Sequence, residues 1–180
     1  MIIYYPYLRG GRYDVIAVRN AASGIVANGK ILPILEPIKV STRPLVRHSA
    51  AFGAAGMSVG LVMNPQVGEL FQNTAATTQL LADMRAAGAT VVPALIVNGA
   101  TGTTEMNSFA AHLQGGRSIY VHYDVPSTPQ VVAQVRAAQG ESLTLARESM
   151  LERRLRPTHP PLQCAPQRSY PLQRAVRESP

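Results

Sequence analysis

Residues 58–97, SVGLVMNPQVGELFQNTAATTQLLADMRAAGATVVPALIV, contain one complete strand–helix–strand unit. Two short apolar runs, 58–63 and 91–97, enclose a segment with the pattern of a helix. Asn73 can cap that helix, apolar residues recur after Asn73 at helical spacing, and Gly88 can end the helix. Short apolar runs bounded by turn residues are typical of strands buried on both faces, as in parallel sheets.

The same unit recurs along the chain. Strand candidates begin 27 to 33 residues apart, and they are Ile2–Tyr5, Ile31–Leu35, Ser58–Met63, Val91–Val97 and Ser118–Tyr123. The intervening segments predict helices at Arg12–Ala27, Ser41–Ala55, Asn73–Ala87, Thr103–Leu113 and Thr128–Ala138. Strands that alternate with helices at this period indicate βαβ units and an α/β fold with a parallel sheet.

Two architectures fit about five such units. One is an incomplete TIM-barrel-like arrangement of repeated βα units, and the other is an open doubly wound sheet. A complete (β/α)₈ barrel typically needs about 250 residues, and this chain has 180. The sequence therefore predicts a partial barrel or an open sheet.

The chain changes character near residue 140. Its last thirty residues hold six prolines and six arginines, and they carry +4 of the net charge of +7. A sixth strand near residue 145 is indicated only weakly, by SLTLA. We therefore expect an α/β domain at 1–140 and an irregular basic segment at 141–180. One interpretation is a disordered basic tail that binds nucleic acid or a membrane surface, and the other is truncation or out-of-frame translation.

Composition limits the compartment and the partners. The single cysteine, Cys164, cannot form an internal disulfide, which favours a reducing compartment. No signal peptide or membrane-spanning run is evident, because the charge-free stretches are interrupted by turn residues. We expect a cytoplasmic protein without a membrane partner.

Polar side chains follow every predicted strand, and in parallel α/β folds ligands bind beyond the carboxyl ends of the strands. The predicted ligand-binding residues are Tyr7, Arg9, Arg12, Lys39, Asn64 and Asn98. The predicted catalytic residues are Glu36, His122 and Asp124. Arginine and lysine at this edge favour an anionic or phosphate-bearing ligand.

Each of these residues also has a structural interpretation. Glu36 can serve as a general acid or base, or it can form an ion pair with Lys39, Arg9 or Arg12. Both asparagines precede turn residues and can simply form turns. His122 and Asp124 are spaced by two, as in a pair that orients a proton carrier or holds a metal.

The sequence names neither a reaction nor a cofactor. The motifs G-x-S-x-G, H-E-x-x-H, C-x-x-C and G-x-G-x-x-G are all absent, and no metal site is predicted. The glycine- and threonine-rich NGATGTT, at 98–104, precedes a predicted helix and could cradle an anion, although it lacks the lysine of a P-loop.

Three motifs carry a family resemblance. YYPYLRG at 4–10, PILEPIK at 33–39 and NPQVG at 64–68 resemble a bacterial family designated by a locus-tag name. That family is in turn distantly similar to the phage-type beta protein family. The match is specific over about the first 70 residues and extends to about residue 125. Its members are longer, which agrees with a truncated or frame-shifted end here.

The resemblance implies a (β/α)-barrel-like fold and a setting in mobile elements or anti-phage defence. It also implies a nuclease-like protein as partner, so the first functional hypothesis is a regulatory component of such a pair. The second is an enzyme acting on an anionic or phosphate-bearing substrate at the strand ends. The third is nucleic-acid binding through the basic tail.

Overall fold

A computed structural model of the chain describes residues 4–99, 101–112, 117–123 and 141–145. Six strands form one sheet in the order β1-β2-β3-β4-β5-β6, and each pairs in parallel with the next. The strands are β1 (Tyr7–Arg9), β2 (Ile34–Glu36), β3 (Ser58–Val62), β4 (Thr90–Val97), β5 (Ile119–Tyr123) and β6 (Glu141–Leu145).

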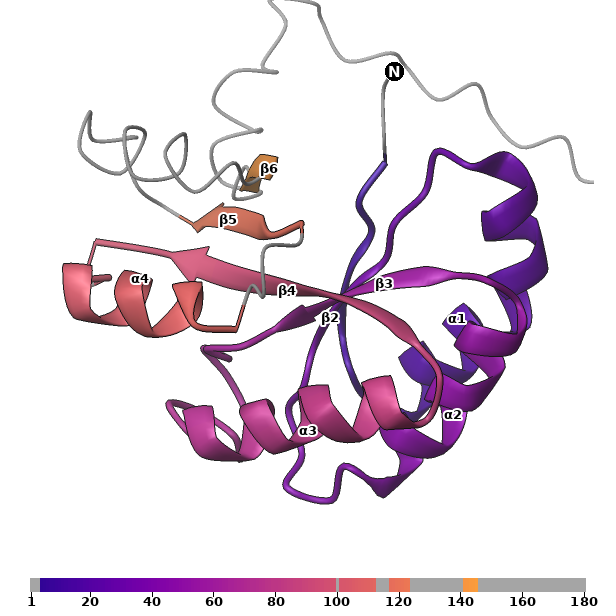
Figure 1. The fold of residues 1–180 in the computed structure, drawn as a ribbon, viewed down its shortest axis with the longest axis horizontal. Coiled ribbons are helices and arrows are strands. Elements are labelled where there is room, and N and C mark those ends of the chain that lie inside the picture. The colour runs from indigo at the N-terminus through magenta and orange to yellow at the C-terminus, as the bar shows by residue number, and fades with distance from the viewer. Residues whose placement is uncertain (1–3, 100, 113–116, 124–140, 146–180) are drawn as a thin grey trace, which may run out of the picture. The chain divides into compact units, whose positions relative to one another are not determined.

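The strand order decides between the two predicted architectures. A doubly wound sheet reverses its order at a switch point, whereas these six strands follow one another without reversal. The sheet curls as a half-barrel, with helices after the first four strands (Figure 1). They are α1 (Arg12–Asn28), α2 (Arg43–Ala54), α3 (Thr74–Ala86) and α4 (Thr103–Ala110). The predicted fold of repeated βα units is confirmed.

The two faces of the sheet carry separate apolar clusters. On the helix face, Leu35, Leu61 and Leu95 pack with buried residues of all four helices. On the other side, here called the inner face, Ile34 and Ile119 belong to a second cluster of strand residues. Side chains alternate between faces along a strand, so the central strands of this partial barrel bury apolar residues on both faces.

Two glycines allow close packing, one on the inner face of the sheet and one between α2 and the turn before β4. A side chain at Gly60 would meet Ile34 and Ile119, so the glycine leaves room for both on the inner face. Gly53 of α2 lies directly against the backbone of Gly88, at the turn before β4. A methyl group at Gly53 would collide with that carbonyl oxygen, and the glycine thereby allows α2 to approach the turn.

The first strand lies later in the chain than the prediction of Ile2–Tyr5. Backbone pairing continues through Pro6, whose carbonyl oxygen accepts from Ile34 N at 2.8 Å, and β1 follows directly. Proline lacks a backbone donor, which a strand at the edge of a sheet can spare. The strand therefore lies at Tyr7–Arg9, beyond the proline at which the predicted range stops.

Other elements fall close to their predicted ranges. Asn73 caps α3, and its side-chain oxygen accepts from Ala76 N at 3.1 Å. β6 lies where the sequence indicated a strand only weakly, and it pairs with β5 just beyond residue 140. The helix predicted at Thr128–Ala138 and the segment 146–180 lie outside the described residues.

Candidate functional site

A buried carboxylate stands at the end of β2 on the inner face. Glu36 is 3% exposed, and its Oε1 accepts a hydrogen bond from Gln66 N at 2.7 Å. The Gln66 side chain donates to Asn64 O at 2.7 Å and accepts from Asn98 Nδ2 at 3.0 Å. The residues that follow three neighbouring strands are thus joined by hydrogen bonds, as the common edge of a parallel sheet predicts.

Two residues of β1 lie on the same side as Glu36. Arg9 is the register partner of Glu36, and Tyr7 is the register partner of Ile34. Tyr7 packs against the inner apolar cluster, while Arg9 is exposed. No ion pair joins Arg9 to Glu36 in the described part of the chain, where Glu36 instead takes its hydrogen bond from a backbone amide.

His122 lies on the opposite side of the sheet from Glu36. Its register partner on β4 is Val97, a member of the helix-face cluster, and Tyr120 two residues before it packs edge-on against Phe109 of α4. His122 is 3% exposed, and burial lowers its pKa. The sheet therefore separates this imidazole from the inner face, and Asp124, its predicted companion, lies outside the described residues.

Asn64 connects the sheet to α4. Its Nδ2 donates to Glu105 Oε1 at 2.7 Å, and both residues line a cavity of about 630 Å³ between α3 and α4. His112 lines the same cavity, with Nε2 3.5 Å from Thr78 Oγ1. No Lys or Arg is among the described residues that line this cavity, and Glu105 is the one carboxylate among them.

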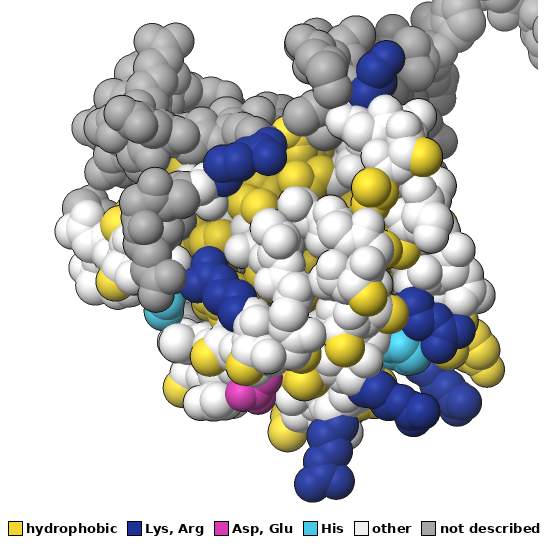
Figure 2. All heavy atoms as spheres, turned by 45° about the vertical axis from the view of Figure 1, so that its right-hand side comes forward, with side chains coloured by type: hydrophobic (Ala, Val, Ile, Leu, Met, Phe, Trp, Pro, Cys, Tyr) yellow, Lys and Arg dark blue, Asp and Glu magenta, His cyan; other side chains and the backbone are white. Residues whose placement is uncertain are grey.

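The basic cavity lies between α1 and α2, beyond the ends of β1 and β2, and has a volume of about 800 Å³. Arg12 and Lys39, both predicted to bind ligand, line it. Its described titratable lining consists of Arg12, Arg19, Lys39, Arg43, Arg47, His48 and Glu69. Figure 2 shows Lys and Arg side chains gathered beside a histidine on this side of the molecule.

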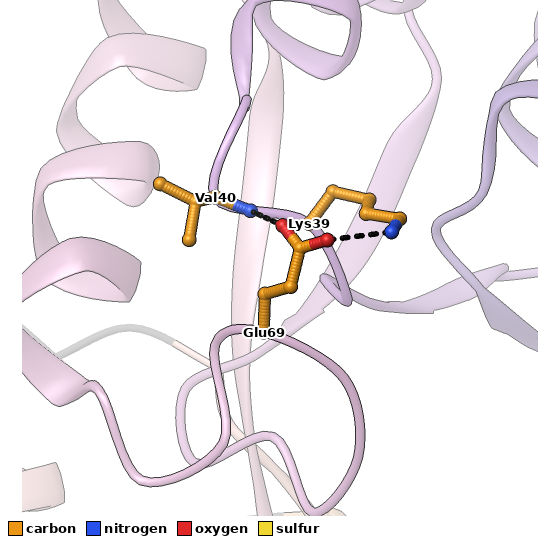
Figure 3. Close-up of polar contacts among 3 residues, drawn as sticks. All are labelled: Lys39, Val40 and Glu69. Atoms are coloured by element: carbon orange, nitrogen blue, oxygen red, sulfur yellow. Dashed lines mark hydrogen bonds and ion pairs between the residues drawn. The ribbon is translucent and has the colours of Figure 1, made fainter.

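Glu69 is the single carboxylate among those lining residues. Its Oε1 accepts from Lys39 Nζ at 2.6 Å, and its Oε2 accepts from Val40 N at 3.1 Å (Figure 3). These hydrogen bonds hold the pKa of Glu69 below its ordinary value of 4.5. Both side chains of the pair are about half exposed or more, at 63% for Lys39 and 49% for Glu69, so solvent screens their attraction.

A glycine brings Glu69 to Lys39. Gly68 has φ +84°, and it lies so close to Ile38 that a side chain there would collide with the Ile38 carbonyl oxygen. The next amide, Glu69 N, donates to Ile38 O at 2.8 Å. The loop after β3 is thereby fastened to the loop after β2, and its Glu69 lines the basic cavity.

The cations of the cavity act on its histidine. Partial burial lowers the pKa of His48, and the positive charges of Arg19 and Arg47 lower it further. Protonation of His48 adds a charge to a region that is already positive. An anion in the cavity would offset that repulsion.

Both helices begin at the basic cavity with an arginine. Arg12 is the first residue of α1 and Arg43 the first of α2, and neither helix has a side-chain hydrogen bond at its N-cap. The N-terminus of a helix carries partial positive charge and free N–H groups, so cations there are unfavourable and anions are favourable. The first turn of α1 also holds Asp14, which offsets Arg12, whereas the first turn of α2 holds no acidic residue and includes Pro44, which lacks an N–H. The unfavourable charge is therefore clearest at α2, and local rules of this kind are typically broken where a protein binds a ligand.

The prediction from residues at the strand ends missed most of the titratable residues that line this cavity. The lining residues that were not predicted belong to helices or to a loop well beyond the strand ends, and they are Arg19, Arg43, Arg47, His48 and Glu69. The signal that could have found them is spacing, because Arg12 and Arg19 are seven residues apart and Arg43 and Arg47 are four apart. Both spacings place cations on one face of a helix.

Comparisons with known proteins add no assignment. No protein-family model matches the chain, and no curated protein or solved structure matches it either. Among the described helices, none has the length and apolar character needed to cross a bilayer.

Proposed function

We propose that this protein binds an anionic, phosphate-bearing ligand in the basic cavity between α1 and α2. The observation that carries the proposal is the described lining of that cavity, where five Lys and Arg side chains face a single carboxylate. A volume of about 800 Å³ lies within the range of small-molecule sites, roughly 300–1,000 Å³. Guanidinium groups donate in pairs to phosphate oxygens, which suits them to such a ligand.

Two further features support an anion. The N-termini of α1 and α2 both open at the cavity, and backbone N–H groups at such termini bind phosphate. The cavity also lies beyond the ends of β1 and β2, at the edge where parallel α/β proteins bind ligands. The nuclease-like partner and nucleic-acid binding through residues 151–180 stay predictions.

Titration with pyrophosphate tests the proposal. We expect saturable binding, measured by calorimetry, that also raises the pKa of His48 in NMR spectra. Lys39→Gln removes one cation of the cavity and should weaken binding about tenfold, since a hydrogen bond to a charged group contributes about 1.5–3 kcal/mol. Lys30→Gln is the matched control, because Lys30 is exposed and lies outside the cavity.

Two results would contradict the proposal. One is the absence of saturable binding by the folded wild-type protein. The other is an equal loss of affinity in Lys39→Gln and Lys30→Gln, which would show that pyrophosphate responds to net charge and not to this cavity.

A further inference from the structure

Resting on the proposed function, we infer that the ligand of the basic cavity carries at least two adjacent phosphate groups, and that Glu69 competes with one of them for Lys39. The inference specifies the ligand as a small polyphosphate, such as a diphosphate or triphosphate ester. Three features of the cavity lead to it: its two helix N-termini, the length of its cationic stripes, and its internal carboxylate.

The cavity offers two separate positions for an anion. One lies at the start of α1 beside Arg12, and the other lies at the start of α2 beside Arg43. Each position combines a helix N-terminus with a guanidinium group. Asp14 in the first turn of α1 is not among the described residues that line the cavity, and Pro44 leaves the first turn of α2 with one N–H fewer. One phosphate can occupy one such position, so filling both requires a second anionic group.

The cations extend away from these two positions along both helices. Arg12 and Arg19 are separated by about 10 Å along the axis of α1, and Arg43 and Arg47 by about 6 Å along α2. All four line the same cavity. A single phosphate with a charge near −2 cannot neutralise such a stripe, whereas a chain of phosphates can.

The remaining lining favours phosphate recognition over base recognition. No Phe, Tyr or Trp side chain is among the described residues of the cavity wall. Proteins that hold single-stranded nucleic acid combine a basic groove with aromatic side chains on which bases stack. A cavity lined by exposed cations and without aromatic rings therefore fits a small polyphosphate better than a nucleic-acid strand.

Glu69 holds a place that a phosphate oxygen would take. Its carboxylate accepts from Lys39 Nζ and from Val40 N, and both are donors that a phosphate can use. The Lys39–Glu69 pair is exposed, so a multiply charged anion can displace the carboxylate from the ammonium group. The backbone bond from Glu69 N to Ile38 O can remain in place during that exchange.

A series of anions tests the inference. Phosphate, pyrophosphate and tripolyphosphate are titrated into the full chain at one ionic strength, with calorimetry and the His48 resonances as readouts. We expect tripolyphosphate to bind at least about tenfold more tightly than phosphate, because a second charged contact contributes more than 1.4 kcal/mol. Arg12→Gln and Arg43→Gln should each remove most of that advantage, and Lys30→Gln should retain it.

A second comparison tests the role of Glu69. Glu69→Gln removes the competing charge and should raise the affinity for tripolyphosphate severalfold, whereas unchanged or weaker binding would overturn the competition. Thermal melting followed by circular dichroism confirms that each variant is folded.

The outcomes separate the inference from the proposed function. If none of the three anions binds, both fail. If phosphate binds as tightly as tripolyphosphate, the cavity still binds an anion but the two-phosphate inference is overturned. If a deoxythymidine octamer displaces tripolyphosphate and binds more tightly at the same ionic strength, the ligand is a nucleic-acid strand and the inference is likewise overturned.

Discussion

The side chain of Asn64 takes the place of a peptide group beside Ile96. Asn64 Oδ1 accepts from Ile96 N, and Asn64 Nδ2 donates to Ile96 O, each at 2.8 Å. Met63 N donates to Ala94 O at 2.8 Å, and the Asn64 side chain then continues the pairing of β3 with β4 at Ile96. The same Nδ2 also donates to Glu105 of α4, so one amide joins the sheet to a helix.

Asn64→Asp should destabilise the protein at neutral pH by about 2–3 kcal/mol, because a buried carboxylate would face the Ile96 carbonyl and Glu105 without a proton to donate. Stability should recover in part as the pH falls, since a protonated Asp can donate again. Chemical denaturation at several pH values measures both effects. Asn107→Asp on the exposed side of α4 is the control, and an equal loss there would contradict the assigned role of Asn64.

Two substitutions of Glu36 distinguish the effect of its charge on stability from the effect of its hydrogen bond. Glu36→Gln retains an oxygen for Gln66 N, so we expect the free energy of unfolding to change by less than about 1 kcal/mol. Glu36→Ala leaves that amide without its acceptor and should cost about 1–3 kcal/mol. Equal losses in the two variants, measured by urea denaturation, would indicate that the charge matters more than the hydrogen bond.

Two helical glycines should respond in opposite directions to the same substitution. Gly53→Ala places a methyl group against the Gly88 carbonyl and should destabilise by about 1–3 kcal/mol or more. Gly24 lies within α1 with nothing near its absent side chain, so Gly24→Ala should stabilise by about 0.5–1 kcal/mol. Thermal melting of both variants is the measurement, and a stable Gly53→Ala would show that α2 can move away from the turn.

The sequence predicts best what depends on neighbouring residues. The Asn73 cap and the helix behind it follow from local chemistry, and the sheet follows from repetition of one unit. Asn64 reads locally as a turn former, and its actual partner, Ile96, lies 32 residues away. Lys39 likewise pairs with Glu69, 30 residues away, because Gly68 docks against Ile38. Such pairings depend on how loops pack, which neither residue type nor periodicity specifies.

The position of β1 shows the same limit at a strand boundary. Pro6 predicts a break, because proline removes a backbone donor and fixes its own φ. The structure uses only the carbonyl of Pro6 for pairing, so the strand continues. The missing N–H of a proline weakens a strand only where a neighbouring strand would accept from it. Which edge of the strand has a neighbour is decided by the assembled sheet.

The lowered pKa of His48 makes the stability of the folded protein depend on pH. Burial, Arg19 and Arg47 lower its pKa in the folded protein below the ordinary value of 6.5. Between those two pKa values the unfolded chain binds more protons than the folded one, so stability rises with pH there. The contribution of His48 to stability is therefore complete above about pH 6.5 and declines as the pH falls through the folded pKa.

Two variants test the pH dependence of stability, and a bound anion should raise the pKa of His48. His48→Gln should flatten the decline in melting temperature below pH 6.5, whereas His112→Gln, away from the basic cavity, should leave the decline intact. An anion bound beside His48 raises its pKa, so by linkage the affinity for pyrophosphate should increase as the pH falls toward 5.5, provided that the charge of pyrophosphate is accounted for. An affinity in His48→Gln with the same pH dependence as the wild type would show that the imidazole does not sense the ligand.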